Sequence, residues 1–267
     1  MSLYRASPKD GIAWITGGSS GIGRALAFRL VERGYKVAIS ANKFELFDKA
    51  MMERDDWQKF KPNIFKYVCD VTDEAAMRDT CNSIIAEHGP ICLAVFNAGT
   101  YEPVEGHKLT TEVFRQTFAV NVQGVVNGIV PVVEHMKQTG KGQIAMTASV
   151  TSYAGLPTAA AYGPTKAALN SMAQSLKFDF DRMNIRVQVI NPGFVHSQLT
   201  NKNSFQMPGI MRADRAATRI ANGFERGGFE LRFPKRLVIP LKIISYLPYP
   251  IYFWLIKKIT GSDQPLV

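Results

Sequence analysis

Residues 12–23 read IAWITGGSSGIG, a short apolar run that leads directly into a glycine-rich turn. The apolar run predicts a buried strand over residues 12–16, and the pattern after the turn predicts a helix over residues 21–32. Glycines permit a tight turn that a ligand can approach closely, and the free N–H groups and dipole at a helix start attract phosphate. A plain tight connection is the alternative. The position between first strand and first helix favours a pyrophosphate site made by Gly17, Ser19, Ser20, Gly21, Ile22 and Gly23.

The same alternation of apolar runs and helical patterns continues along the chain. It predicts further strands at 35–40, 63–69, 91–97, 142–149 and 186–191, and helices at 44–53, 73–88, 110–138 and 212–226. Strands that are apolar throughout and separated by helices indicate a parallel sheet covered on both faces. The predicted fold class is therefore α/β, a doubly wound parallel sheet of the Rossmann type.

The sequence shows no clear domain boundary within this series of strands and helices. No sequence repeat, low-complexity stretch or linker rich in proline and serine is present. We expect a single domain whose first part, residues 1–196, holds the sheet and the dinucleotide site, followed by an insert over 197–228. Residues 229–267 are expected to supply the last strand and an apolar C-terminal extension.

Composition limits the classes of partner. The 267 residues include 32 Lys and Arg against 22 Asp and Glu, a net charge of +10 that favours phosphorylated cofactors or anionic membrane surfaces. The chain lacks zinc-finger spacing, a basic tail and interleaved RNA-binding aromatics, so no nucleic-acid partner is predicted. Cys69, Cys81 and Cys92 suit reduced, buried thiols and not metal ligands. The N-terminus lacks an apolar signal core, and a cytoplasmic protein is expected.

The segment AYGPTK at residues 161–166 places a tyrosine and a lysine four positions apart. On a helix, Tyr162 and Lys166 lie on the same face, and a nearby ammonium favours the phenolate form of tyrosine. Such a pair suits proton exchange that accompanies hydride transfer to a carbonyl. A buried aromatic beside a solvated lysine is the alternative interpretation. Pro164 fits best in a first helical turn.

The end of the second predicted strand bears on cofactor choice. It reads Ser40-Ala41-Asn42-Lys43, without the carboxylate that would bind the adenosine ribose hydroxyls of NAD. Asn42 and Lys43 can instead donate to a 2′-phosphate, so NADP(H) is favoured over NAD(H). A merely solvated Lys43 at the helix start is the alternative.

Together these segments resemble the short-chain dehydrogenase/reductase family over about residues 10–200. The resemblance rests on several motifs in order. They are the Thr16–Gly23 turn, Cys69-Asp70-Val71, Asn97-Ala98-Gly99, Asn121, Ser149, Tyr162 with Lys166, and Asn191-Pro192-Gly193.

The resemblance implies an NAD(P)-dependent oxidoreductase and gives each motif a role. It also implies that residues 1–196 are the dinucleotide-binding catalytic part and that residues 197–228 form a lid over the substrate. Tyr162 would be the general acid or base, Lys166 would lower its pKa and hold the nicotinamide ribose, Ser149 would hydrogen-bond the substrate oxygen, and Asn121 would hold a water of a proton relay. The cofactor would also meet three further groups. These are Asp70 and Val71 at the adenine, Asn97, Ala98 and Gly99 at close backbone approach, and Pro192, Gly193, Val195 and Ser197 around the carboxamide.

Two departures from the family pattern concern the cofactor and the proton donor. Asn42 stands where NADP-preferring members often carry arginine, and Pro164 lies inside the segment of Tyr162 and Lys166. Some proteins of this fold keep the dinucleotide site as a sensor, which is the alternative function. The family also implies a homo-oligomer, either dimer or tetramer.

From residue 237 to 259 the chain is apolar and aromatic, with prolines that divide it and lysines at its ends. A similar tail occurs in the hydroxysteroid and long-chain carbonyl branches of the family. Apolar faces with cationic flanks suit helices in a membrane interface, while a dimer contact and a cover over the protein's own pocket remain as alternatives. In each case the tail favours a lipophilic carbonyl or alcohol as substrate.

Overall fold

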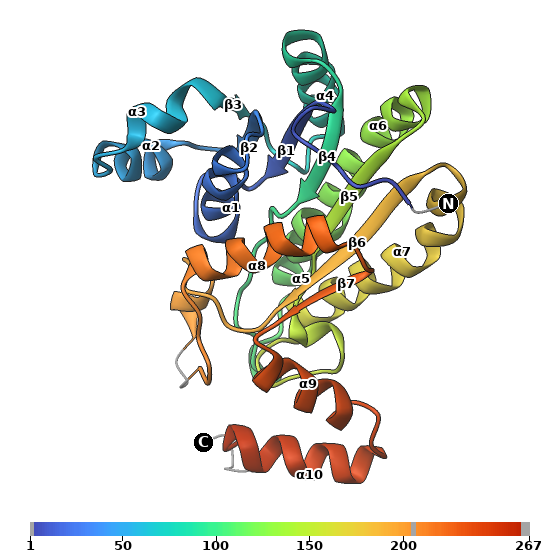
Figure 1. Ribbon diagram of the computed structural model, residues 1–267. Coiled ribbons are helices and arrows are strands. Elements are labelled where there is room, and N and C mark those ends of the chain that lie inside the picture. Colours follow the sequence, from blue (N-terminus) through green and yellow to red (C-terminus); the bar gives the residue numbers. More distant parts are fainter. Residues whose placement is uncertain (1–2, 204–206, 263–267) are drawn as a thin grey trace.

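Seven strands form one parallel sheet in the order β3-β2-β1-β4-β5-β6-β7 (Figure 1). The computed structural model describes residues 3–203 and 207–262, so the outer ends of the predicted first and last segments, and lid residues 204–206, lie outside the described residues. Pairing between neighbours is parallel throughout. The predicted doubly wound α/β fold is confirmed. The strands are β1 (Ile12–Thr16), β2 (Val37–Ala41), β3 (Ile64–Val68), β4 (Ile91–Phe96), β5 (Gly142–Thr147), β6 (Ile185–Pro192) and β7 (Glu230–Phe233).

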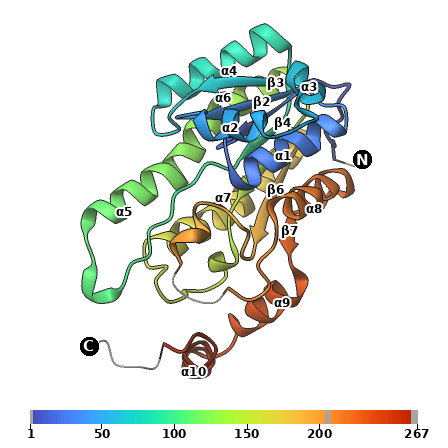
Figure 2. The same ribbon diagram turned by 90° about the vertical axis from the view of Figure 1, so that its left-hand side faces the viewer.

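Helices cover both faces of the sheet (Figures 1 and 2). On one face lie α1 (Gly21–Glu32), α2 (Glu45–Met52) and α8 (Ala213–Arg226), with the short α3 (Trp57–Phe60). On the other lie α4 (Glu74–His88), α6 (Gly124–Thr139) and α7 (Tyr162–Arg182). Successive side chains of β1 alternate between the two cores, Ala13 and Ile15 in the first and Ile12 and Trp14 in the second. Burial on both faces is why the inner strands β1 and β4 are buried throughout, whereas the edge strand β3 alternates in exposure and carries Lys66.

The helix predicted over residues 110–138 is present but is not a regular α-helix throughout. It consists of α5 (Thr111–Phe118), a π-helical turn η3 (Ala119–Gln123) and α6. A π turn holds one more residue than an α turn, and such turns are common at functional sites. Here it carries Asn121, whose side chain forms hydrogen bonds with the backbone N–H and C=O of Thr100. Apolar periodicity cannot reveal an inserted residue of this kind.

The C-terminal extension follows β7 as two helices, α9 (Lys235–Ile244) and α10 (Tyr249–Thr260). They project beyond the sheet at one end of the molecule (Figure 2). α10 buries Tyr252 and Ile256, and the Tyr252 hydroxyl donates to the carbonyl oxygen of Gly155 in the loop before α7. Within residues 3–203 and 207–262, none of the helices has the length and apolar character needed to cross a bilayer.

Candidate functional site

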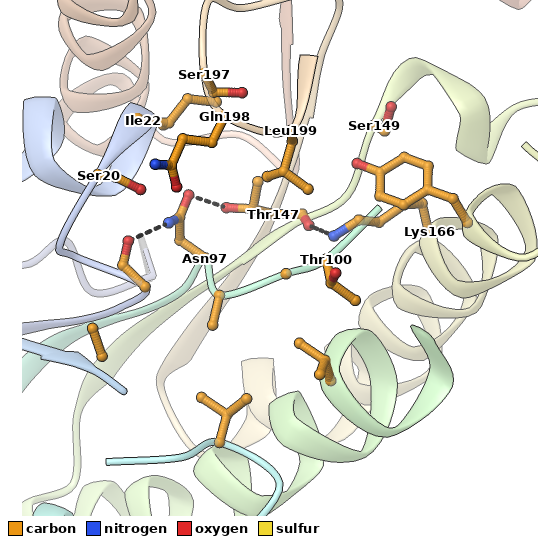
Figure 3. Close-up of a pocket in the computed structure, with 18 of the residues that line it drawn as sticks. Ser20, Ile22, Asn97, Thr100, Thr147, Ser149, Lys166, Ser197, Gln198 and Leu199 are labelled. Atoms are coloured by element: carbon orange, nitrogen blue, oxygen red, sulfur yellow. Dashed lines mark hydrogen bonds between the residues drawn. The ribbon is translucent and has the colours of Figure 1, made fainter. Parts of the chain in front are cut away.

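A cavity of about 870 Å³ opens at the carboxyl ends of the strands. In open α/β sheets, ligands bind in the crevice where the strand order reverses, which here is between β1 and β4. Most of the residues predicted as site residues line this cavity (Figure 3). They are Gly17, Ser19, Ser20, Gly21, Ile22, Asn42, Asp70, Val71, Asn97, Ala98, Gly99, Ser149, Tyr162, Lys166, Pro192, Gly193, Val195 and Ser197.

Hydrogen bonds and close backbone packing hold the glycine turn against the end of β4. Gly17 has a positive φ of 65°, and a β-carbon at this position would lie 2.7 Å from the Ala98 Cα. The Thr16 hydroxyl accepts hydrogen bonds from the backbone N–H groups of Asn97 and Ala98 at 3.0 and 3.1 Å. The Asn97 amide donates in turn to the carbonyls of Thr16 and Gly17. The backbone of both segments is therefore fixed around the cavity.

Gly23 is not among the residues that line the cavity. A β-carbon at Gly23 would lie 2.3 Å from the Gly17 carbonyl oxygen and 2.6 Å from the Asn97 amide nitrogen. Gly23 therefore lets α1 begin close against the turn. The spacing of the glycines alone could not distinguish this packing role from contact with the cofactor.

The end of β2 separates the two predicted phosphate donors. Asn42 lines the cavity, and its amide donates to Asp70 Oδ2 at 3.2 Å. The other oxygen of Asp70 accepts from the backbone N–H and the hydroxyl of Thr72 at 2.9 and 2.8 Å. Lys43 is exposed and does not line the cavity, which fits the solvated alternative. Asn42 is the better placed of the two donors.

Tyr162 and Lys166 lie on the first two turns of α7, as predicted, and Pro164 falls in the first turn. The ammonium nitrogen of Lys166 is 5.3 Å from the centre of the Tyr162 ring and donates to the Thr147 carbonyl at 2.8 Å (Figure 3). Lys166 is only 3% exposed, and this burial lowers its pKa to about 8. The side chain is still protonated at neutral pH.

The pKa of Tyr162 is raised and not lowered in the protein without a bound cofactor. Burial raises the pKa of Tyr162 to about 12, a hydrogen bond with Ser149 opposes this rise, and Tyr101 adds to it. The Lys166 ammonium is committed to the Thr147 carbonyl, so its effect does not offset burial. At neutral pH the Tyr162 phenol holds its proton and can donate it to an oxygen that gains negative charge.

Asn121 lies behind the cavity wall and does not line it. Its side chain is fully buried, accepts from the Thr100 N–H at 2.7 Å, and donates to the Thr100 carbonyl and the Thr165 hydroxyl, each at 3.0 Å. A β-carbon at Gly99 would lie 3.2 Å from Asn121 Oδ1 and 3.4 Å from Lys166 Nζ. The amide oxygen and the ammonium therefore both face the Gly99 backbone.

Sequence reasoning missed several residues of the site. Thr147 supplies a backbone carbonyl, which any residue could provide and which leaves no sequence signal. The Tyr101 ring packs edge-on against Tyr162 with ring centres 5.1 Å apart, and an aromatic two residues after Gly99 could have been noticed. The cavity is also lined by residues 198–200 and by Lys202 of the segment predicted as a lid.

Comparison with known proteins gives consistent matches. The family model described as short chain dehydrogenase matches residues 11–207. An uncharacterized oxidoreductase of Myxococcus xanthus is 32% identical over 240 residues, which cover 90% of this chain and 94% of that protein. An NADP-dependent (R)-specific alcohol dehydrogenase of Lentilactobacillus kefiri is 30% identical over 197 residues, 72% of this chain and 76% of that protein.

Among solved structures, a short-chain dehydrogenase from Streptomyces avermitilis has a TM-score of 0.77 with this chain. It is 20% identical, and the match covers 98% of this chain and 100% of that one. At this level of identity the match supports the fold.

Proposed function

This chain belongs to the short-chain dehydrogenase family, and from that premise we propose that it interconverts a lipophilic carbonyl compound and its alcohol with NADP(H). Membership makes it an NAD(P)-dependent oxidoreductase that acts on CH–OH groups. The observation that carries the reaction is the arrangement of Ser149, Tyr162 and Lys166 in one cavity with the glycine turn.

When bound, the nicotinamide dinucleotide supplies or accepts the hydride. The N–H groups at the start of α1, with Ser19 and Ser20, would bind the pyrophosphate, and Asp70 and Val71 would meet the adenine. Residues 97–99 would let backbone approach the cofactor, and Pro192, Gly193, Val195 and Ser197 would bracket the carboxamide. Gly21 and Ser197 are close in the structure, because a β-carbon at Gly21 would lie 3.3 Å from the Ser197 Cβ.

In the reduction direction, the carbonyl oxygen gains negative charge and needs a proton. Tyr162 would donate that proton, because burial keeps its phenol protonated at neutral pH. Ser149, which lines the cavity with Tyr162 and acts to lower its pKa, would donate a hydrogen bond to the same oxygen. The Lys166 ammonium would hold the nicotinamide ribose and favour the phenolate that remains. Asn121 would hold a water through the second lone pair of its amide oxygen, which also accepts from the Thr100 N–H.

The proposed preference for NADP(H) rests on the end of β2. Asn42 lines the cavity there, and no carboxylate follows the strand to repel a 2′-phosphate. The relative from Lentilactobacillus kefiri is described as NADP-dependent, which supports the same preference.

A lipophilic substrate is proposed from the C-terminal extension. The hydrogen bond from Tyr252 to Gly155 fixes α10 against the loop that leads to Tyr162. Eight of the fifteen large apolar side chains that are exposed in the described residues belong to α9, α10 and the turn between them, so exposed apolar side chains are concentrated beside the substrate end.

Peripheral membrane contact through residues 237–259 is proposed from the same surface. Phe253 and Trp254 are more than half exposed, and Lys257 and Lys258 stand beside them. Between Leu231 and Ser262 the chain has no Asp or Glu, so its charge complements anionic lipid. The three cysteines are buried free thiols, which fits a reducing compartment such as the cytoplasm.

Assembly as a homo-oligomer is proposed from α7. Phe178 on this helix is 78% exposed, and α7 packs beside α5, whose Phe118 is also exposed. A second copy could cover this surface. Light scattering should then show a dimer or tetramer for the natural chain and a smaller species for Phe178→Glu.

The function is tested by turnover of a panel of aliphatic, aromatic and steroidal carbonyls with NADPH. Tyr162→Phe should reduce kcat at least about 100-fold while cofactor affinity changes little, because the substitution removes only the phenol proton. Cofactor binding by the natural chain without turnover of any carbonyl would favour the alternative of a dinucleotide sensor.

A further inference from the structure

A polar network joins β7 to the turn that carries Ser149. Its centre is Glu230, the first residue of β7, whose side chain is only 16% exposed. One carboxylate oxygen accepts from the Asn191 amide at 2.9 Å and from the Tyr153 hydroxyl at 2.5 Å. The other accepts from Lys242 at 2.7 Å and from Arg232 at 2.9 Å. Burial opposes ionisation, yet these donors together hold the pKa of Glu230 below its ordinary value.

The network reaches the Ser149 turn at two adjacent residues. Tyr153 is bound directly by Glu230, and Ser152 lies 3.2 Å from the Asn191 amide oxygen. The Ser152 hydroxyl also contacts the Ser149 carbonyl and accepts from Asn170 of α7. These residues directly follow Ser149 in the short helical turn η4 (Val150–Ser152).

The carboxylate of Glu230 determines the orientation of Asn191. A carboxylate only accepts hydrogen bonds, so the nitrogen end of the fully buried Asn191 amide must face Glu230. The oxygen end is thereby directed at Ser152. The same amide nitrogen also donates to Asn170 Oδ1 at 3.3 Å, a longer contact with an uncharged acceptor, so loss of the carboxylate removes the stronger of the two acceptors that hold this orientation.

We infer that Glu230 is a positioning residue, which fixes the Ser149 turn through Tyr153, Asn191 and Ser152 and thereby aims the Ser149 hydroxyl at Tyr162. The inference rests on the roles that the proposed function gives Ser149 and Tyr162. A displacement of a reacting group by about 1 Å can cost on the order of 100-fold in rate, so a turn held from two sides serves the reaction.

Lys242 makes the C-terminal extension part of the same network. Its ammonium bonds Glu230 and also lies 5.1 Å from the centre of the Tyr153 ring. The first helix of the extension, α9, packs against η4. A shift of α9 would therefore also move the turn that carries Ser149.

The test compares Glu230→Gln with the matched control Arg232→Gln. Arg232 is 39% exposed and donates to Glu230 Oε2, not to the Oε1 that accepts from Tyr153 and Asn191, so its loss leaves those two bonds in place. The chain is labelled with ¹³C at the tyrosine Cζ, whose NMR signal responds to hydrogen bonding at the phenol. Signals are assigned by their disappearance in Tyr153→Phe and Tyr162→Phe.

In Glu230→Gln both the Tyr153 and the Tyr162 signals should move, and in Arg232→Gln both should stay. The kcat of Glu230→Gln should fall about 10-fold or more while its dissociation constant for NADPH stays within about 2-fold, because the affected turn meets the substrate and not the cofactor phosphates. A merely structural role would lower cofactor affinity and kcat together.

A Tyr162 signal that stays in place while the Tyr153 signal moves would overturn the inference. The NMR measurement needs no turnover, so it decides this inference even if the carbonyl panel fails and the proposed function falls. Should Glu230→Gln fail to fold, Lys242→Gln combined with Tyr153→Phe removes two of the four donors, and a retained kcat would then count against the inference.

Discussion

The ammonium nitrogen of Lys166 lies 2.8 Å from the carbonyl oxygen of Thr147, the last residue of β5. This bond connects the helix that carries Tyr162 to the strand that precedes Ser149. It also gives the buried cation one strong acceptor from the protein. The position of Lys166 is thus fixed by the sheet, and its charge is kept in spite of burial.

Replacement of Lys166 should change how stability depends on pH. Burial lowers the pKa of Lys166 from 10.5 to about 8 in the folded chain. Between these values the unfolded chain binds the proton and the folded chain does not, so the free energy of unfolding rises with pH. Relative to Lys166→Met, the natural chain should gain roughly 3 kcal/mol as pH rises through this window.

Urea unfolding of both chains between about pH 7 and 10 checks this expectation. Tyr162 has the opposite effect, because its pKa is raised from 10.0 to about 12 and stability falls with pH between those values. Measurements below about pH 10 avoid that contribution. A difference between the two chains that does not change with pH would contradict the burial of the ammonium.

Asn121→Leu should lower both stability and activity. The substitution leaves the backbone N–H and C=O of Thr100 without their partners and removes the bond to Thr165. Each buried polar group left unpaired costs about 1–3 kcal/mol, so a loss of roughly 3 kcal/mol is expected in urea unfolding. The kcat should fall at least about 10-fold, because Thr100 and Gly99 lie beside Lys166.

Thr165→Val is a partial control for Asn121: it keeps both bonds to Thr100 and removes the Thr165 hydroxyl, which accepts from Asn121 and donates to the Tyr162 carbonyl. It should cost about 1–2 kcal/mol and less activity than Asn121→Leu. If Asn121→Leu lost activity but kept its free energy of unfolding, the Asn121 amide would act in the reaction and would not stabilise the contact between the two chain segments.

The sequence was sufficient for the sheet and for most of the cavity lining. Strands buried on both faces leave long apolar runs, and a glycine turn leaves a spacing, so both are visible in the residue order. The π turn at Asn121, the packing role of Gly23 and the carbonyl of Thr147 were not visible. They depend on backbone geometry or on backbone atoms, which do not select a residue type strongly enough to show.

The pKa of Tyr162 could not be predicted from the sequence for a different reason. Sequence spacing correctly placed Lys166 on the same helical face, but it could not weigh the ammonium against burial. That balance depends on Tyr101, on Ser149 and on the Thr147 carbonyl, which come from separate parts of the chain.

Asn42→Asp should shift cofactor preference from NADP(H) towards NAD(H). The new carboxylate would lie next to Asp70, where Asn42 now donates at 3.2 Å, and would repel a 2′-phosphate. We expect the dissociation constant for NADPH to rise about 10-fold or more and that for NADH to change less. Fluorescence titration with each cofactor measures both constants.

Two controls separate charge from lost contact at this position. Asn42→Ala removes the amide without adding charge and should weaken NADPH less than Asn42→Asp does. Lys43→Ala should have little effect, because Lys43 is exposed and outside the cavity. A large loss of NADPH affinity in Lys43→Ala would instead show that this lysine reaches the 2′-phosphate.

The C-terminal extension should bind vesicles that contain anionic lipid more strongly than neutral ones. Trp254 is 60% exposed, and the ammonium of Lys258 lies 5.3 Å from the centre of its ring, so an aromatic and a cation stand together on α10. Each basic residue near an anionic surface contributes about 1 kcal/mol. Lys257→Gln with Lys258→Gln should therefore weaken binding by roughly 30-fold, measured by co-sedimentation with vesicles of mixed neutral and anionic phospholipid.

Phe253→Ser and Met52→Ser form a pair for the apolar part of this contact. Both side chains are more than half exposed, but Phe253 lies on α10 and Met52 on α2, away from the surface proposed for assembly. Burial of one large apolar side chain contributes about 1.5–3 kcal/mol, so Phe253→Ser should reduce vesicle binding about 10-fold or more and Met52→Ser should not. Equal losses in the two variants would mean that α10 is not the docking element. If neither the natural chain nor its variants bound vesicles, the extension would instead be a dimer contact or a cover over the protein's own pocket.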